Sequence, residues 1–260
     1  MHILEEKVRA AKKHGRPALI PFITAGFPDR ERFLDVLREL DGSGADVIEI
    51  GVPFSDPVAD GPVVEKASHD AVANGVNLRG IIRLLQRHRG ELKAGLVLMG
   101  YMNPFLQYGP ERFAHDAAEA GVHGCIVPDL PLDEADAFRT ILKRHGIALI
   151  ALVGPNTPEE RMKRYAEVSE GYVYVVSVLG TTGERGALPA EVPQVLARAK
   201  SAFPLPVALG FGLKEPEQLD SLPMELRPDA AVFGSSLLTH IGSGRAPADF
   251  MRKWTGCSPA

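Results

Sequence analysis

Short apolar segments alternate with segments of helical periodicity along almost the whole chain. Each apolar segment is rich in residues typical of β-strands and ends near Gly, Pro or Asp, and the segments between them carry apolar residues three or four positions apart. The strand candidates are residues 17–26, 45–51, 94–100, 122–129, 147–155, 172–180, 205–212 and 229–236. The helical segments are residues 29–44, 77–90, 109–121, 132–146, 157–171 and 188–203. Because parallel strands need a long crossover connection, usually a helix, this alternation predicts a parallel sheet.

Eight such strands in a chain of 260 residues predict a closed (β/α)₈ barrel, the TIM-barrel fold of the α/β class. No linker interrupts the pattern, so we expect a single domain over residues 1–260. We expect two helices beyond the standard barrel, one in the amphipathic N-terminal segment 1–15 and one after the second strand, at about 62–74. The alternative is an open sheet of six or seven strands. A Rossmann fold is disfavoured because no Gly-rich dinucleotide turn follows the first strand.

Composition and charge disfavour several classes of function. The net charge is −4 with acids and bases mixed along the chain, so no basic block predicts binding to nucleic acid or to anionic lipid. The N-terminus lacks the apolar region of a signal peptide, and no apolar run reaches the roughly 18 residues of a membrane span. The two cysteines, Cys125 and Cys257, do not form a disulfide framework, and Cys125 lies in an apolar run typical of a core. We therefore expect a cytoplasmic protein.

The first candidate for chemistry is Glu49, an acid inside the apolar strand candidate 45–51. In this fold the active site lies at the C-terminal ends of the strands. Strand side chains alternate, so Ile48 and Ile50 should face the helices while Val47 and Glu49 face the barrel interior. A partly desolvated carboxylate there has a raised pKa and can transfer protons near neutral pH. The alternative is an acid that caps a neighbouring backbone amide.

Asp60 closes the loop "PFSDPVAD", which contains two prolines and follows the same strand. A stiff loop of this kind can hold a side chain in a defined place over the barrel mouth. The alternative is a helix N-cap, because Asp60 lies just before the helical segment at 62–74 and acids are common capping residues. Asp56 has the same ambiguity.

Glycine-rich sequences follow the last three strand candidates: "LGTTG", "GFG" and "FGSS". Barrels often bind phosphate with the loops after strands seven and eight and with the N-terminus of a short helix. The candidate phosphate-binding residues are Gly183, Gly212, Gly234 and Ser235. The alternative is ordinary strand-to-helix turn chemistry.

Aromatic and apolar residues near the strand ends form a second group of candidates. Tyr174 shares its strand parity with Tyr172 and Val176, so it can face the barrel interior, although a core tyrosine is the alternative. The residues that could form a wall for a flat apolar ligand are Phe22, Met99, Tyr101, Val127 and Phe211. Core packing explains each of these equally well.

Metal and nucleophile chemistry are not predicted. The eight histidines are scattered, and His123 begins the fourth strand, at the end opposite to the expected site. No His, Asp or Glu cluster has the spacing of metal ligands, and no Ser or Cys lies in a recognisable nucleophile elbow.

Several of these segments together resemble those of a known family. The chain is similar to the tryptophan synthase alpha chain family over essentially its whole length. The segments that carry the resemblance are "PFITAGFP", "IEIGVPFSDPVADGP", "GYMNPF", "GVHGCIVPDLP", "VYVVSVLGTTGER", "ALGFG" and "FGSS". The second segment is the most specific, because it places both carboxylates at the family's spacing.

The resemblance implies a (β/α)₈ barrel that cleaves indole-3-glycerol phosphate to indole and glyceraldehyde 3-phosphate in tryptophan biosynthesis. It implies that Glu49 is the general acid/base, that Asp60 stabilises the charge at the indole N–H, and that Tyr174 lies beside the catalytic acid. By the same resemblance, phosphate is bound by Gly183, Gly212, Gly234 and Ser235. The indole pocket is formed by Phe22, Met99, Tyr101, Val127 and Phe211, and Thr182 interacts with the second acid when its loop closes.

The resemblance also implies cofactors and partners. The family uses no metal and no organic cofactor, and it pairs with a beta chain in an α2β2 heterotetramer. Pyridoxal phosphate belongs to that beta chain, which receives the indole. The region of residues 53–60 and the loop after strand six are expected at the contact.

Some positions depart from the family's commonest pattern. The loop after strand six reads "LGTTGER", where many members have Val before the Thr and a neutral residue before the Arg. Strand five is followed by "GPNT", where a small residue and Ser or Thr are more usual. Both acids remain, so these differences bear on loop closure and on the partner surface.

Three alternative functions share parts of this pattern. A free-standing indole-3-glycerol-phosphate lyase would use the same two acids without a beta chain. A sugar-phosphate isomerase or epimerase would need His or metal ligands at the strand ends, which this chain lacks. A degenerate activator of the partner chain would not need the intact Glu49 and Asp60.

Overall fold

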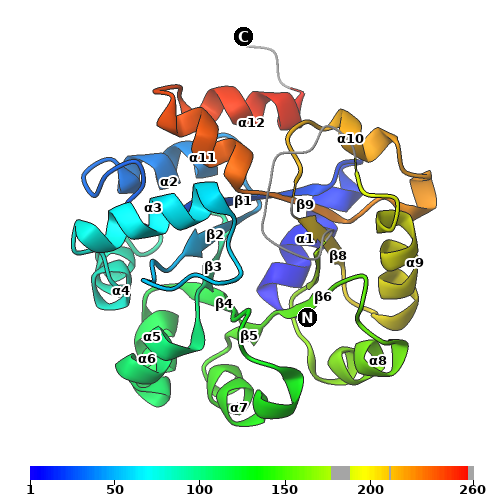
Figure 1. The fold of residues 1–260 in the computed structure, drawn as a ribbon, viewed down its shortest axis with the longest axis horizontal. Coiled ribbons are helices and arrows are strands. Elements are labelled where there is room, and N and C mark those ends of the chain that lie inside the picture. Colours follow the sequence, from blue (N-terminus) through cyan, green and yellow to red (C-terminus); the bar gives the residue numbers. More distant parts are fainter. Residues whose placement is uncertain (177–187, 211, 257–260) are drawn as a thin grey trace.

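The computed structural model describes residues 1–176, 188–210 and 212–256. Parallel strands form a barrel at the centre, and helices surround it (Figure 1). In the described residues the sheet has the strand order β5-β4-β3-β2-β1-β9-β8-β7-β6. The strands are β1 (Ala18–Thr24), β2 (Val47–Gly51), β3 (Gly95–Met99), β4 (Val122–Ile126), β5 (Ala148–Leu149), β6 (Ala151–Val153), β7 (Val173–Val176), β8 (Val207–Gly210) and β9 (Ala230–Phe233).

Strands β5 and β6 are two halves of one extended segment, separated only by Ile150. The first half pairs with β4 and the second half pairs with β7, so the chain passes from one neighbour to the other. Across the interruption the Ile150 N–H still donates to the Cys125 carbonyl at 2.9 Å. All eight predicted strands are therefore present, and the TIM-barrel prediction is confirmed.

The helices follow the strands in the predicted alternation. They are α1 (Ile3–Lys13), α2 (Phe33–Gly42), α3 (Pro62–Ala73), α4 (Leu78–Arg87), α5 (Met102–Tyr108), α6 (Pro110–Glu119), α7 (Asp136–Arg144), α8 (Glu159–Val168), α9 (Val192–Ala202), α10 (Glu217–Asp220), α11 (Ser235–Gly242) and α12 (Pro247–Thr255). Two 3₁₀ turns, η1 (Leu132–Glu134) and η2 (Met224–Leu226), complete the set in the described residues. The two predicted additional helices are α1 and α3. In the ranges described, no helix is both long enough and apolar enough to cross a membrane.

Helix α1 packs against the interior of the barrel through Leu4 and Val8, which are both fully buried. The strands leave space for Leu4 because glycines face it. A Cβ atom on Gly95 or Gly124 would lie only 2.6 or 2.7 Å from the Leu4 methyl groups. Helix α1 also contacts the early strands β1, β3 and β4. The N-terminal segment therefore plugs the barrel, which explains why its apolar face is needed.

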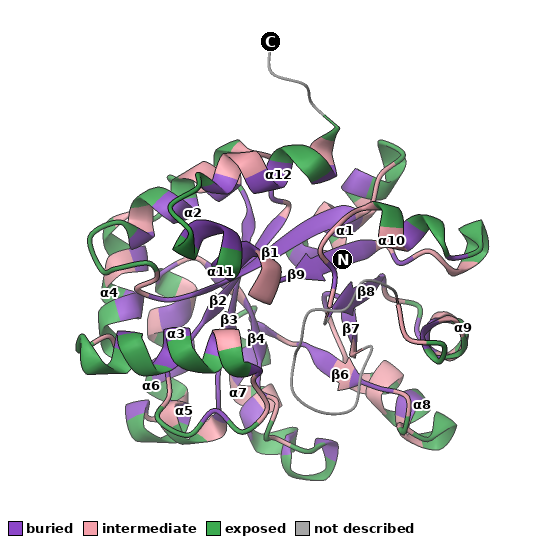
Figure 2. Ribbon diagram, turned by 45° about the horizontal axis from the view of Figure 1, so that its top comes forward, coloured by how far each residue is buried: buried purple, intermediate pink, exposed green. Residues whose placement is uncertain are grey.

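The hydrophobic side chains form two clusters separated by the strands. Ile48 and Ile50 belong to the larger cluster between strands and helices, whereas Val47 belongs to the cluster inside the barrel. Cys125 is fully buried in the larger cluster, as its apolar sequence predicts. Figure 2 shows the same division: the strands are mostly buried, while the helices are buried mainly on the sides facing the strands. The alternation predicted for the second strand is confirmed.

Candidate active site

Glu49 lies in the middle of β2, where its neighbours across the sheet are Phe22 on β1 and Val97 on β3. Its side chain is fully buried inside the barrel. The Tyr172 hydroxyl donates a 2.7 Å hydrogen bond to Glu49 Oε1, and Oε2 has no partner among the described residues. Burial raises the pKa of Glu49 from 4.5 to about 8, although the hydrogen bond from Tyr172 lowers it in part. Near neutral pH this carboxyl group therefore holds a proton that it can give away.

Asp60 is held by Tyr101, whose hydroxyl donates to Asp60 Oδ2 at 3.1 Å. The same hydroxyl accepts a 2.9 Å hydrogen bond from the Ala59 N–H. Helix α3 has Gly61 as its N-cap and no side-chain cap hydrogen bond, so the helix-cap interpretation of Asp60 is wrong. Burial raises the pKa of Asp60 from 3.8 to about 6; the Tyr101 hydrogen bond lowers it and the charge of Glu65 raises it further.

The loop between β2 and α3 is fixed from two sides. The Ser68 hydroxyl of α3 accepts from the Phe54 N–H and donates to the Phe54 carbonyl, both at 2.9 Å. The Phe54 ring stacks on Tyr101 with ring centroids 5.4 Å apart. Asp56 lies exposed in the same loop. The loop thus places Asp60, and not Asp56, against the strand ends.

One pocket brings together Asp60 and three residues of the predicted apolar wall, Phe22, Met99 and Tyr101. Its remaining lining residues are Thr24, Gly51, Val52, Val64, Ser68, Gly100 and Pro128. Val127, the fourth predicted wall residue in the described ranges, instead lines a separate cavity with residues of α7 and α8. Phe211 lies outside the described residues. The pocket combines an aromatic wall with one carboxylate, in a free volume of about 10 Å³ that is about large enough for one water molecule.

The sequence reasoning missed two polar residues of this region. Tyr172 is fully buried inside the barrel and contacts Glu49 directly; its shared parity with Tyr174 was the available signal. Thr24 ends β1 with a buried hydroxyl that has no partner among the described residues, and it lines the pocket of Asp60. A threonine at the C-terminal end of an apolar strand was its only signal.

Tyr174 lies inside the barrel, close to both carboxylates. The pKa of its phenol is raised by burial first, then by the charges of Glu49 and Asp60. Its ring lies over β8, because a Cβ atom on Gly210 would be only 2.1 Å from the Tyr174 hydroxyl oxygen. Glycine at position 210 therefore makes room for this tyrosine.

Three of the four predicted phosphate-binding residues follow the neighbouring strands β8 and β9. Gly234 is the N-cap of α11, Ser235 is the first residue of that helix, and no side chain caps it. Gly212 follows β8 with a positive φ of 96°, a conformation that favours glycine. The Phe22 ring lies beside Gly234, where a Cβ atom would be 3.0 Å from Phe22 Cδ1. Phe22 thus joins the pocket of Asp60 to this helix N-terminus.

Two of the predicted residues in the loop after β7, Thr182 and Gly183, lie outside the described residues. Within the described ranges, no three His, Cys, Asp or Glu side chains are grouped so that they could hold a metal ion.

Comparisons with known proteins identify the family of this chain. Residues 8–254 match the family model of the tryptophan synthase alpha chain. The tryptophan synthase alpha chain of Desulfovibrio desulfuricans is 64% identical over 254 residues, covering 98% of this chain and 100% of that protein. A solved structure of Mycobacterium tuberculosis tryptophan synthase is 32% identical with a TM-score of 0.87 over 98% of this chain and 96% of that one. The structure of the tryptophan synthase α2β2 complex from Pyrococcus furiosus contains a chain that is 38% identical with a TM-score of 0.84, over 92% and 98% of the two chains. The chain therefore belongs to the tryptophan synthase alpha chain family.

Proposed function

We propose that Glu49 and Asp60 together carry out the reaction of this family in the present chain. The alpha chain of tryptophan synthase is a lyase that cleaves indole-3-glycerol phosphate to indole and glyceraldehyde 3-phosphate. The observation that carries the assignment is the pair of unlike carboxyl groups. One is enclosed in the barrel with a pKa of about 8, and the other lies in an aromatic pocket with a pKa of about 6. Between these values the first is an acid and the second is an anion.

Glu49 acts as the general acid and then as the general base. Breaking the bond between indole C3 and the side chain requires a proton at C3, which the carboxyl group of Glu49 supplies. The resulting carboxylate then takes the proton of the side-chain hydroxyl as the aldehyde forms. The electron pair of the broken carbon–carbon bond returns to the ring, so protons and electrons balance. A positioned acid–base group of this kind contributes about 10²–10⁴ in rate.

Asp60 stabilises the charge that the first proton transfer creates. Protonation at C3 places a positive charge on the ring nitrogen, on a different edge of the ring from C3. A single carboxyl group cannot serve both edges, which explains the need for a second acid. The anion of Asp60 accepts a hydrogen bond from the ring N–H and lowers the energy of the charged intermediate.

The remaining predicted residues bind and orient the substrate. Phe22, Met99 and Tyr101 hold the indole ring, and Phe211, outside the described residues, is proposed for the same wall. Val127 lines the separate cavity instead and is not part of this pocket. Tyr174 lies beside the catalytic acid. Phosphate is bound by Gly183, Gly212, Gly234 and Ser235, and Thr182 closes over the second acid. This chemistry needs neither a metal nor an organic cofactor in this chain.

The partner is a beta chain, with two chains of each kind in an α2β2 heterotetramer. The neighbour from Pyrococcus furiosus belongs to a complex of this composition. Two large apolar side chains are exposed near the strand ends of the present chain: Val58, in the loop of Asp60, is 72% exposed and Leu106, on α5, is 55% exposed. Apolar side chains at an otherwise polar surface are typical of a contact site. Pyridoxal phosphate is expected in the beta chain only.

The direct test is an indole-release assay with indole-3-glycerol phosphate, run with and without a beta chain. The unmodified chain should release indole, and Glu49→Gln should reduce the rate by about 10²–10⁴ while glycerol phosphate still binds. Near-normal turnover by Glu49→Gln would refute the assignment. Full turnover without any beta chain would favour a free-standing lyase.

A further inference from the structure

A third concave site lies on the outer side of the barrel, between the start of α2 and helix α4. It has a volume of about 280 Å³. Its walls come from the loop after β1, from α2, from the connection between α3 and α4, and from α4 itself. The lining residues, which we call the α2–α4 groove, are Ala25, Gly26, Arg30, Phe33, Gly75, Val76, Asn77, Gly80, Ile81, Arg83, Leu84 and Arg87. None of them lines the pocket of Asp60.

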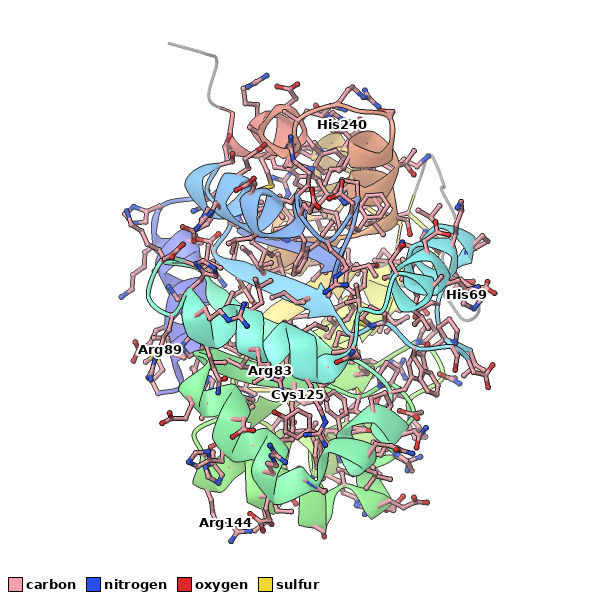
Figure 3. The ribbon with its side chains drawn as sticks, turned by 90° about the vertical axis from the view of Figure 1, so that its left-hand side faces the viewer. His69, Arg83, Arg89, Cys125, Arg144 and His240 are labelled. Carbon is pink, nitrogen blue, oxygen red and sulfur yellow. The ribbon has the colours of Figure 1, made fainter. Side chains whose placement is uncertain are left out.

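The groove is strongly cationic. Arg30, Arg83 and Arg87 contribute to its walls, and none of its lining residues is acidic. Within the described part of the chain, Arg30 donates only to the Asn74 carbonyl, at 3.3 Å, and Arg83 and Arg87 form no ion pair. Figure 3 shows Arg83 on the exposed side of α4, facing outwards from the barrel. Three guanidinium groups therefore surround one hollow without a carboxylate to neutralise them.

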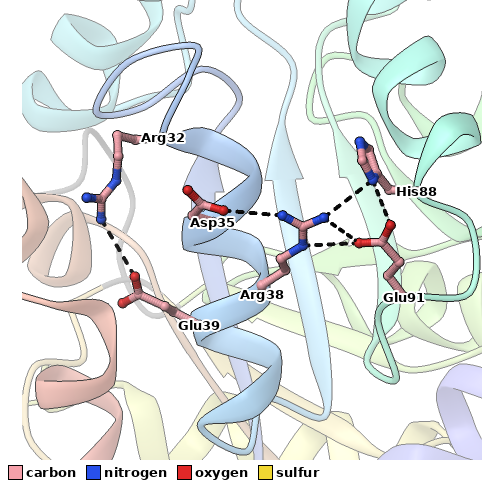
Figure 4. Close-up of polar contacts among 6 residues, drawn as sticks. All are labelled: Arg32, Asp35, Arg38, Glu39, His88 and Glu91. Atoms are coloured by element: carbon pink, nitrogen blue, oxygen red, sulfur yellow. Dashed lines mark hydrogen bonds and ion pairs between the residues drawn. The ribbon is translucent and has the colours of Figure 1, made fainter.

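The arginines next to the groove behave differently. Farther along α2, Arg38 pairs with Glu91 at 2.7 Å and with Asp35 at 3.3 Å (Figure 4). Arg32, the N-cap residue of α2, lies 3.6 Å from Glu39 of that helix. Positive charge on the α2 side of the groove is thus neutralised by neighbouring acids, in contrast to the charge of the residues that line the groove.

The floor of the groove is apolar, and one wall is the first turn of α4. Ala25, Phe33 and Ile81 are buried beneath it. Asn77 caps α4 by accepting from the Gly80 N–H at 3.0 Å. Gly80 lowers the stability of the helix by about 1 kcal/mol relative to alanine, but it leaves this wall of the groove without a side chain. The helix N-terminus adds a partial positive charge to that of the arginines.

We propose that the α2–α4 groove binds a small organic dianion, of the phosphate monoester class, with an apolar body. Guanidinium groups form paired hydrogen bonds with phosphate oxygens, and the arginines are placed to bind the anion from two sides, α4 and the loop after β1. The apolar floor of Phe33 and Ile81 accommodates the organic part. The volume suits a ligand of the size of phenyl phosphate.

The test is a titration with phenyl phosphate, followed by amide chemical shifts. The barrel mouth also binds phosphate under the proposed function, so the readout must be specific for the site. Binding to the groove shifts the amides of Gly75, Asn77 and Gly80, whereas binding at the barrel mouth shifts Gly234 and Ser235. The dissociation constant from the groove amides should be about 1 mM or lower. Absence of shifts at these three amides up to about 10 mM would overturn the proposal.

Two substitutions distinguish a specific binding site from general electrostatic attraction. Arg83→Gln should weaken binding at the groove amides by about tenfold or more, because one charge-assisted hydrogen-bonding group is lost. The matched control is Arg89→Gln, an exposed arginine just beyond the end of α4 (Figure 3). Equal weakening by the two substitutions would refute the proposal.

Inorganic phosphate should bind more weakly than phenyl phosphate, and equal affinity would refute the role of the apolar floor. Indole release should be unchanged in Arg83→Gln, which shows that the barrel is intact.

Discussion

The Tyr172 hydroxyl donates a 2.7 Å hydrogen bond to Glu49 Oε1 inside the barrel, and both residues are fully buried. The bond connects the residue just before β7 to β2 across the barrel interior. It holds one carboxylate oxygen, while Oε2 has no partner among the described residues. Tyr172 therefore orients the proposed catalytic acid and leaves one of its oxygens available for proton transfer.

Replacing Tyr172 by Phe should move the alkaline limb of the activity profile to higher pH. The hydrogen bond from Tyr172 lowers the pKa of Glu49, so its loss raises that pKa above the value of about 8. Indole release measured between pH 5 and pH 10 reports the shift. The matched control is Tyr108→Phe, which removes a 2.7 Å hydrogen bond to Asp116 outside the site. An alkaline limb that is the same in Tyr172→Phe and in the unmodified chain would contradict this positioning role.

The unmodified chain should show a bell-shaped pH dependence of kcat/KM. Asp60 must be an anion, so activity rises with pH through its pKa of about 6. Glu49 must hold a proton, so activity falls as pH rises through its pKa of about 8. A rate that does not change from pH 5 to pH 9 would be incompatible with the assigned roles.

Asp60→Asn should lower kcat by about 10²–10³, because the amide keeps the shape of the side chain but loses the negative charge that faces the ring nitrogen. Indole release at pH 7 measures the effect. Asp56→Asn is the matched control, since Asp56 lies exposed in the same loop. If the two substitutions reduced kcat to a similar extent, the loop and not the carboxylate would be responsible.

Glu49→Gln should stabilise the folded protein increasingly as the pH rises from about 4.5 to about 8. The ordinary pKa of a glutamate is 4.5, and the pKa of Glu49 in the folded protein is about 8. Between these pH values the folded state therefore binds more protons than the unfolded state. The free energy of unfolding of the unmodified chain therefore falls with rising pH, by up to about 1.4 kcal/mol per pH unit from this group. Urea unfolding at several pH values measures the difference. Glu119→Gln, on the exposed side of α6, should show no such trend.

Much of the fold could be predicted from the sequence because it depends on local periodicity. The eight strands and the two additional helices lie where alternation and helix signals placed them. The same period of two decided that Glu49 points into the barrel, because its apolar neighbours Ile48 and Ile50 face the helices. The extent of the domain, the cytoplasmic location and the role of each site residue stay predictions.

The interactions of the acids were decided only by the tertiary structure. In the sequence, Asp60 fitted a helix cap as well as a catalytic group. In the structure Gly61 is the N-cap of α3, and Asp60 instead accepts a hydrogen bond from the Tyr101 hydroxyl, from the end of the next strand. Tyr172 is far from Glu49 in the chain, and only closure of the barrel brings the two together. Periodicity determines which face a side chain occupies, because it is a property of the local backbone. A raised pKa depends on which distant groups exclude water from the carboxylate, and those groups are assembled only when the barrel closes.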